Sequence, residues 1–190
     1  MALCSFLLPL LLLWQGPAQS PAKPASAAAP LPPESIPWSA KRPLTWADFK
    51  SRPTTTDRLA ALTSGTIDVQ VGCTDFVFHA TVRAVFLSQE SWVRDPAKAS
   101  ANLLRHEQLH FDITELHARM LRQKLSLAKL DCQRINPAFN NLTKAAFSAW
   151  QREEARYDQE TNHGLNADKQ KFWETQVQQR LALLESFAVR

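Results

Sequence analysis

Apolar and polar residues alternate along one stretch of the chain. Between residues 67 and 71 apolar side chains occupy every second position, and a second alternating run extends from Phe76 to Phe86. A period of two residues is typical of half-buried strands. We therefore expect two antiparallel strands, joined around Gly72-Cys73-Thr74-Asp75.

Beyond residue 95 the apolar spacing changes to three and four residues, which indicates helices. Asp95-Pro96 is a favourable helix start, because Asp serves as N-cap and Pro fits the first helical position. One long helix is predicted from a face that carries Leu103, His106, His110, Ile113, His117 and Leu121. A further helix is expected from Pro137 to about Arg156. Gly164 and Asn166 end one segment and begin another, and the last segment is expected to be an amphipathic helix to the C-terminus, with Phe172, Trp173, Val177, Leu181 and Leu184. The predicted fold is α+β, a small antiparallel sheet packed with three helices.

The first residues have the composition of an export signal. Residues 1–14 are almost all apolar, and the small-residue stretch Gly16-Pro17-Ala18 follows, so we interpret residues 1–18 as a signal peptide, with a retained anchor as the alternative. Residues 19–37 are rich in proline and alanine and are expected to form a linker. Residues 38–190 would then form one metal-binding domain.

Charge and cysteine content narrow the class of protein further. The net charge of +4 is modest and the basic residues are scattered, which argues against nucleic-acid binding. Cys73 and Cys132 are the only cysteines after the expected leader. An even count in an exported chain favours one disulfide over two separate buried thiols. We expect a periplasmic or secreted protein.

Residues 106–110 read His-Glu-Gln-Leu-His. Helical residues four apart lie one turn apart on one face, so both imidazoles can reach one zinc ion at about 2.0–2.1 Å. Glu107 points about a quarter turn away, where its carboxylate can take a proton from a zinc-activated water. The motif predicts a hydrolytic zinc site with Glu107 as general base. The alternative is a pair of histidines packed on an amphipathic face.

A catalytic zinc site needs a third protein ligand. His117 lies about 10.5 Å beyond His110 along a straight helix, too far for the same ion. The preferred candidate is His163, which directly precedes Gly164 at an expected helix end. Asp158 and Glu160 are the carboxylate alternatives. Nearby Tyr157 could polarise a carbonyl or stabilise an oxyanion as a second catalytic residue.

The sequence is compatible with more than one role for the other acidic residues near the motif. Asp112 and Glu115 lie on the turn after His110, where either could accept the second ring N–H of a ligating histidine. Both could equally face solvent. The pair Glu153-Glu154 is expected to lie on a solvated helix face.

Four segments together resemble a known family: Leu44-Thr-Trp46 with Asp48-Phe49, Ser91-Trp92, the run from His106 to Ile113, and the run from Tyr157 to Gly164 followed by Gln170 and Trp173. They are similar to the bacterial domain-of-unknown-function 922 family, described as predicted secreted zinc-dependent proteases. The resemblance spans roughly Trp38 to the C-terminus. It implies a zincin-like core around His106, Glu107 and His110, and makes His163 a plausible ligand.

These observations lead to three hypotheses. The first is an exported zinc metallopeptidase, in which a strand such as Phe76 to Phe86 could hold a peptide or protein substrate by strand addition. The second is a non-catalytic, zinc-stabilised module that binds a cell-envelope component. A closed site with four protein ligands would favour the module, and an open position would favour the hydrolase. The third is a metal-free helical interaction protein.

Overall fold

The structure is a computed structural model that describes residue 31 and residues 34–189. The expected signal peptide and most of the expected linker lie outside the described residues. Ser35–Pro37, assigned by composition to the linker, form a strand instead. In chain order the elements are β1 Ser35–Pro37, η1 Trp46–Asp48, β2 Ala61–Leu62, β3 Gly65–Thr74, β4 Val77–Leu87, β5 Trp92–Val93, α1 Ala101–Leu127, α2 Ala138–Thr161, α3 Ala167–Leu183 and η2 Glu185–Phe187.

The main sheet has the strand order β1-β4-β3, and both pairings are antiparallel. Its alternating residues Ile67, Val82, Ala84 and Phe86 are buried and contribute to a core shared with α1. The two predicted strands are therefore confirmed. The predicted turn is wrong by two residues, because β3 continues to Thr74 and the chain reverses at Asp75 and Phe76.

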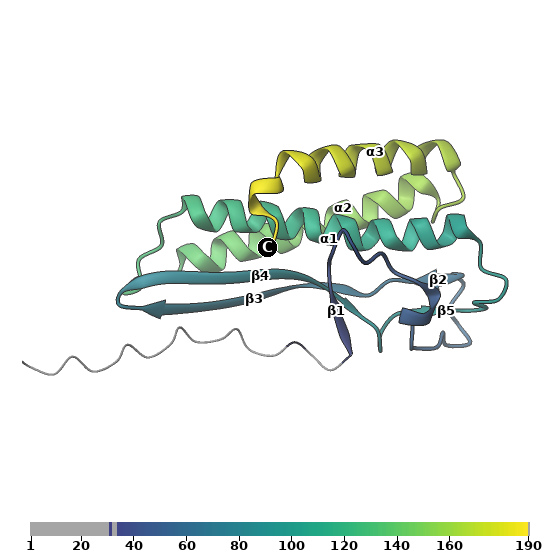
Figure 1. The fold of residues 1–190 in the computed structure, drawn as a ribbon, viewed down its shortest axis with the longest axis horizontal. Helices are drawn as coiled ribbons and strands as arrows, with labels where there is room; N and C mark the ends of the chain where they lie inside the picture. The colour runs from purple at the N-terminus through teal and green to yellow at the C-terminus, as the bar shows by residue number, and fades with distance from the viewer. Residues whose placement is uncertain (1–30, 32–33, 190) are drawn as a thin grey trace, which may run out of the picture.

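The three predicted helices are present, and they stack on one side of the main sheet (Figure 1). The long helix α1 begins later than Asp95-Pro96 suggested. Ser100 is its N-cap and accepts a hydrogen bond from the Leu103 amide at 3.1 Å. Asp95 instead starts a turn, in which its carbonyl accepts from the Lys98 and Ala99 amides. The α+β architecture expected from the pattern is thus confirmed.

A second, two-stranded sheet pairs β2 with β5. It lies near the N-terminal end of α1, opposite to the tip of the β3–β4 hairpin (Figure 1). Two-residue strands carry too few positions to show a period of two, so the sequence pattern did not predict them. The Thr63 hydroxyl, directly after β2, donates to the Glu107 carbonyl at 3.1 Å and fixes this small sheet on α1.

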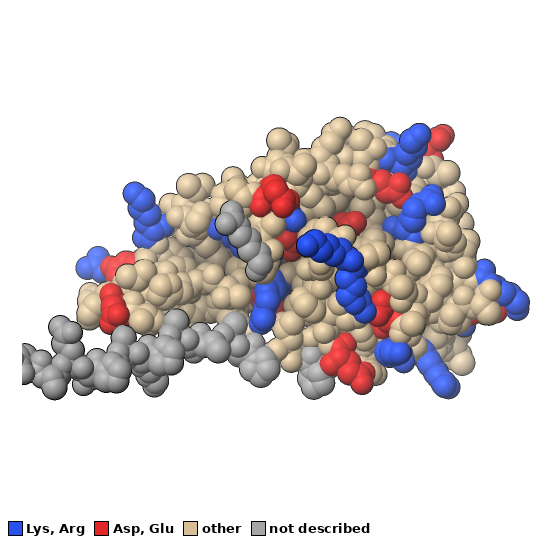
Figure 2. Space-filling model, in the orientation of Figure 1, with Lys and Arg blue, Asp and Glu red and all other residues tan. Residues whose placement is uncertain are grey.

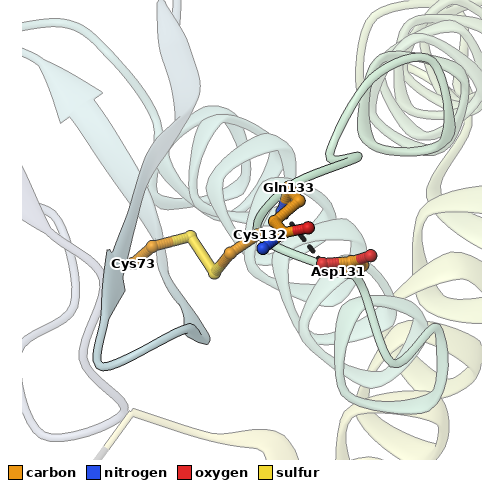
Figure 3. The surroundings of a disulfide bond; sticks show 4 residues. All are labelled: Cys73, Asp131, Cys132 and Gln133. Atoms are coloured by element: carbon orange, nitrogen blue, oxygen red, sulfur yellow. Dashed lines mark hydrogen bonds between the residues drawn. A yellow bond between two sulfur atoms is a disulfide. The ribbon is translucent and has the colours of Figure 1, made fainter.

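The predicted disulfide joins Cys73 of β3 to Cys132 in the loop between α1 and α2 (Figure 3). It holds the outer part of the hairpin against the far end of α1. In that loop the Gln133 amide donates to the Asp131 carboxylate at 2.9 Å. The disulfide closes a chain separation of 59 residues, for which the loop-entropy estimate is about 4 kcal/mol.

Charged side chains of both signs are interspersed on the face drawn in Figure 2, and the lysines and arginines form no continuous stripe there. This distribution agrees with the scattered basic residues of the sequence. Within residues 34–189, no helix combines the length and the apolar character needed to cross a membrane.

Candidate metal centre

His106 and His110 lie side by side on the first half of α1. Their ring centroids are 4.9 Å apart, and His106 is almost completely buried. The four-residue spacing brings the two rings together on one helix face, as the motif predicted. Each ring directs its Nε2 atom toward α2, the helix that packs beside α1.

Asp158 of α2 meets both histidines. Its Oδ1 atom lies 3.1 Å from His106 Nε2 and 3.0 Å from His110 Nε2. The candidate ligand atoms of the three side chains all lie within 4.8 Å of one another. The sequence had kept Asp158 as an alternative third ligand, and the packing of α2 on α1 brings this carboxylate to the histidine pair.

The protonation of this cluster reflects its burial and its hydrogen bonds. Burial alone would lower the pKa of His110, but the hydrogen bonds to Asp158 and Glu154 outweigh it and raise the pKa to about 10. Burial would raise the pKa of Asp158, yet the bonds from His106 and His110 hold it well below its usual range. These two pKa directions fit an ion pair between His110 and Asp158.

His163, the preferred third ligand from the sequence, lies at the edge of the cluster. Its Nδ1 atom is 3.3 Å from Asp158 Oδ1, and its side chain is 51% exposed. It is not one of the three side chains that converge within 4.8 Å. Glu160, the other alternative, points elsewhere: it accepts hydrogen bonds from Arg156 at 2.7 Å and from Trp173 at 3.0 Å.

A turn in left-handed backbone conformation links α2 to α3 and packs on His106. Asn162, His163 and Gly164 have φ angles of 50°, 52° and 80°. A Cβ atom on Gly164 would lie only 2.9 Å from His106 Cγ. This position therefore requires glycine both for its backbone conformation and for its close approach to the histidine ring.

The Nδ1 atoms of the two histidines, which face away from Asp158, also have partners. The sequence analysis did not assign either partner to the site. His110 Nδ1 lies 2.5 Å from Glu154 Oε2, and His106 Nδ1 lies 3.1 Å from Gln170 Oε1. Glu154, expected on a solvated face, is thus part of the site. Its place one helical turn before Asp158 was the available signal. Gln170 comes from α3, and its only signal was its place among the residues of the family resemblance, after the run from Tyr157 to Gly164.

The other acidic candidates lie on a different side of α1. Asp112 accepts hydrogen bonds from the Trp38 indole and the Gln108 amide, both at 2.8 Å. Burial raises the pKa of its carboxyl group. Glu115 is bound by Arg119 and Arg122. Neither residue contacts a ring nitrogen of His106 or His110.

Tyr157 is completely buried beside the histidines. Its ring stacks on His106 with centroids 4.7 Å apart. Its hydroxyl can donate to Gln170 Oε1 at 2.8 Å or to the His106 carbonyl at 3.1 Å. Burial raises the pKa of the phenol. These contacts fit a group that holds His106 and Gln170 in place, whereas an oxyanion role stays a prediction.

Glu107 is only 3% exposed, and it lines a small cavity of about 90 Å³. No hydrogen bond or ion pair among the described residues involves its carboxylate. Every fully buried side-chain oxygen of the described residues has a hydrogen-bond partner. Because the Glu107 carboxylate has none, its oxygens are not fully buried. The cavity is lined by Leu59, Ala60, Ala61, Leu62, Thr63, Leu103, His106, Glu107, His110, Asp158 and His163.

A second cavity of about 320 Å³ adjoins the first, because both are lined by Leu62, Thr63, His110 and Asp158. It extends away from Glu107 toward Trp150 and Thr114. The histidine–aspartate cluster therefore lies between two open spaces. Of the chain segment 59–65, residues 59–63 line the first cavity and residues 62–65 line the second.

The donor set suits a zinc ion. Two imidazole nitrogens and a carboxylate oxygen are common zinc ligands, and ligand atoms about 2.05 Å from a tetrahedral ion lie about 3.3 Å from each other. The distances of 3.1 and 3.0 Å from Asp158 Oδ1 to the two Nε2 atoms are close to this value. The adjoining cavity leaves space for a further ligand such as water.

Comparison with known proteins agrees with the resemblance noted in the sequence. A family model described as bacterial protein of unknown function (DUF922) matches residues 44–164, the part of the chain that includes α1, α2 and the turn on His106. Searches of curated proteins and of solved structures found no match. The matched region covers well over half of the sequence, and the chain therefore belongs to the DUF922 family of bacterial proteins.

Proposed function

We propose that this protein is a zinc-dependent hydrolase, specifically a peptidase, whose metal is held by His106, His110 and Asp158. The convergence of their ligand atoms within 4.8 Å supports this proposal most directly. His163 stands next to this set and could complete it or contact substrate. When bound, zinc would supply Lewis-acid activation of water and of a substrate carbonyl.

Glu107 is the general base in this proposal. Glu107 lines the same cavity as the three ligands, and its carboxylate has no hydrogen-bond or ion-pair partner among the residues that the structure describes. It can therefore accept a proton from the attacking water at one carboxylate oxygen and pass it to the leaving nitrogen of the substrate.

The segment 59–65 is the wall along which a peptide substrate would lie. The Arg94 amide donates to the Ala60 carbonyl at 2.9 Å, so in the antiparallel pairing of β2 with β5 the N–H and C=O of Ala61 point away from β5. Leu62, the next residue of β2, is 37% exposed and lines both cavities, and in this proposal an extended peptide is held along the segment by strand addition. The strand 76–86 suggested for this role by sequence lines neither cavity.

The disulfide supports the proposal of an exported, periplasmic or secreted protein. Disulfides persist in oxidising compartments and are rare in reducing ones. The bond between Cys73 and Cys132 holds an exposed hairpin to the helices, so the fold makes structural use of oxidation.

Metal content and hydrolysis test the proposed function together. We would measure zinc by elemental mass spectrometry and hydrolysis of an unfolded protein substrate by peptide mapping, for the wild type, His106→Ala and Glu107→Gln. We expect about one zinc per chain in the wild type and in Glu107→Gln, and none in His106→Ala. Hydrolysis should fall by about 10²- to 10⁴-fold in Glu107→Gln.

Three outcomes of these measurements would contradict parts of the proposed function. A wild type without zinc would overturn the metal site. Zinc without hydrolysis of any unfolded protein or peptide substrate would replace the peptidase with the zinc-stabilised binding module. Activity that survives in Glu107→Gln would remove Glu107 as base.

A further inference from the structure

The two histidines of the proposed zinc site are held by groups of different charge. Each ring turns Nε2 toward Asp158 and Nδ1 toward a second partner. For His110 that partner is the carboxylate of Glu154, and for His106 it is the side-chain amide of Gln170. The electrostatic support of the two rings therefore differs by one unit of charge.

Glu154 is fixed by several contacts in addition to His110. Its Oε1 atom accepts from the Trp150 indole at 2.8 Å and lies 3.4 Å from the Thr114 hydroxyl. Its Oε2 atom lies 2.5 Å from His110 Nδ1. An ionised carboxylate can only accept hydrogen bonds, so His110 carries its proton on Nδ1 when it presents a free electron pair on Nε2.

Gln170 is oriented by its other neighbours. Its Nε2 donates to Glu174 Oε1 at 3.1 Å, while its Oε1 can accept from the Tyr157 hydroxyl at 2.8 Å. The oxygen of the amide must therefore face His106 Nδ1, at 3.1 Å. His106 is thus also held with its proton on Nδ1, but by a neutral acceptor.

We propose that Glu154 and Gln170 are positioning residues that direct the Nε2 atoms of His110 and His106 toward zinc, and that Glu154 makes His110 the stronger ligand. A carboxylate behind an imidazole increases its basicity and fixes its orientation, whereas a neutral amide mainly fixes the orientation. The inference rests on the proposed function only in that His106 and His110 bind the metal. It does not require hydrolysis.

Zinc affinity of the full chain tests this inference. We would remove the metal and measure the zinc dissociation constant by competition with a chromophoric chelator for the wild type, Glu154→Gln and Gln170→Met. We expect Glu154→Gln to bind zinc about 10- to 100-fold more weakly. Gln170→Met should lose less, about tenfold or under, because it removes a neutral acceptor.

Glu153→Gln is the matched control, since Glu153 is the adjacent carboxylate and faces His117 instead. It should bind zinc within about twofold of the wild type. Loading with Co²⁺ gives a readout that general destabilisation would not move: the visible absorption bands should shift in Glu154→Gln and stay unchanged in Glu153→Gln.

Each result bears on a separate part of the inference. Equal zinc affinity in Glu154→Gln and the wild type, with unshifted Co²⁺ bands, would overturn the role of Glu154. A greater loss in Gln170→Met than in Glu154→Gln would overturn the ranking of the two histidines. Failure of the wild type to bind zinc would overturn the proposed function as well, and this outcome is visible before any variant is compared.

Discussion

Two parts of α1 place a histidine against a carboxylate of α2. At one, His110 meets Glu154 and Asp158. Two turns further along, His117 meets Glu153 at 2.8 Å. Both histidines are shielded from solvent, and all three carboxylates come from α2. The sequence pattern treats the two positions as equivalent members of one helix face.

We call His110 with Glu154 and Asp158 the metal region, and His117 with Glu153 the second region. An arginine distinguishes them. Arg180 of α3 binds both carboxylate oxygens of Glu153. Among the described residues, neither lysine nor arginine pairs with Asp158, whose ionic partners are His106, His110 and His163. A carboxylate neutralised by arginine is complete as a structural ion pair, whereas one balanced by histidines alone can exchange their protons for a metal ion.

The largest expected effect comes from removing a histidine at each region. His110→Ala should weaken zinc binding by more than about 100-fold, because it deletes a ligand and not only an outer partner. His117→Ala should leave zinc binding unchanged while lowering the stability. The dissociation constants and chemical denaturation of both variants measure this contrast. Comparable loss of zinc in His117→Ala would break the comparison.

Gly164 tests how closely the metal region depends on the turn that packs against it. Gly164→Ala should cost about 2–3 kcal/mol of stability, because it adds backbone strain and a Cβ within 2.9 Å of His106. Zinc affinity should fall with it. Gly72→Ala is the control, since no atom lies within 4 Å of the added carbon. Equal stability and equal zinc affinity of the two variants would contradict the assigned contact.

Arg180→Met examines the arginine that distinguishes the second region. We expect a loss of about 2 kcal/mol in unfolding free energy, because Glu153 loses the guanidinium that balances its charge. This is less than for a fully buried pair, since the Arg180 side chain is 35% exposed. Zinc affinity should stay as in the wild type. A fall in affinity without a fall in stability would show that the two regions are not separate.

Of these changes, lowering the pH should have the smallest effect on the stability that the second region contributes. Burial would raise the pKa of Glu153, but the bonds from His117 and Arg180 outweigh it and lower the pKa to about 2 from a usual 4.5. The stability from this depressed pKa is fully present above pH 4.5 and is lost as the pH falls toward 2. We expect Glu153→Gln to remove about 1 kcal/mol of the pH dependence between pH 5 and 3. Matching denaturation curves against pH in wild type and variant would contradict this role.

The periodic parts of the chain were predictable from sequence, and contacts between separate elements were not. The alternating run of β4 and the three helices follow from local spacing, as does the juxtaposition of His106 and His110. The choice between Asp158 and His163 depends on how α2 packs and how its final turn bends. Gln170 joins the cluster only because α3 returns beside α1, a rotation that no local pattern specifies.

The disulfide has a consequence for how the fold opens. β3 and β4 extend past the sheet contact with β1, and most of their outer residues, from Val71 to Thr81, are exposed. Cys73–Cys132 is the covalent link between this part and the helices. Without it, the outer hairpin would become a local unfolding unit whose amide hydrogens exchange well before those of α1. The metal region, roughly 30 Å away along α1, would keep its own, higher opening energy.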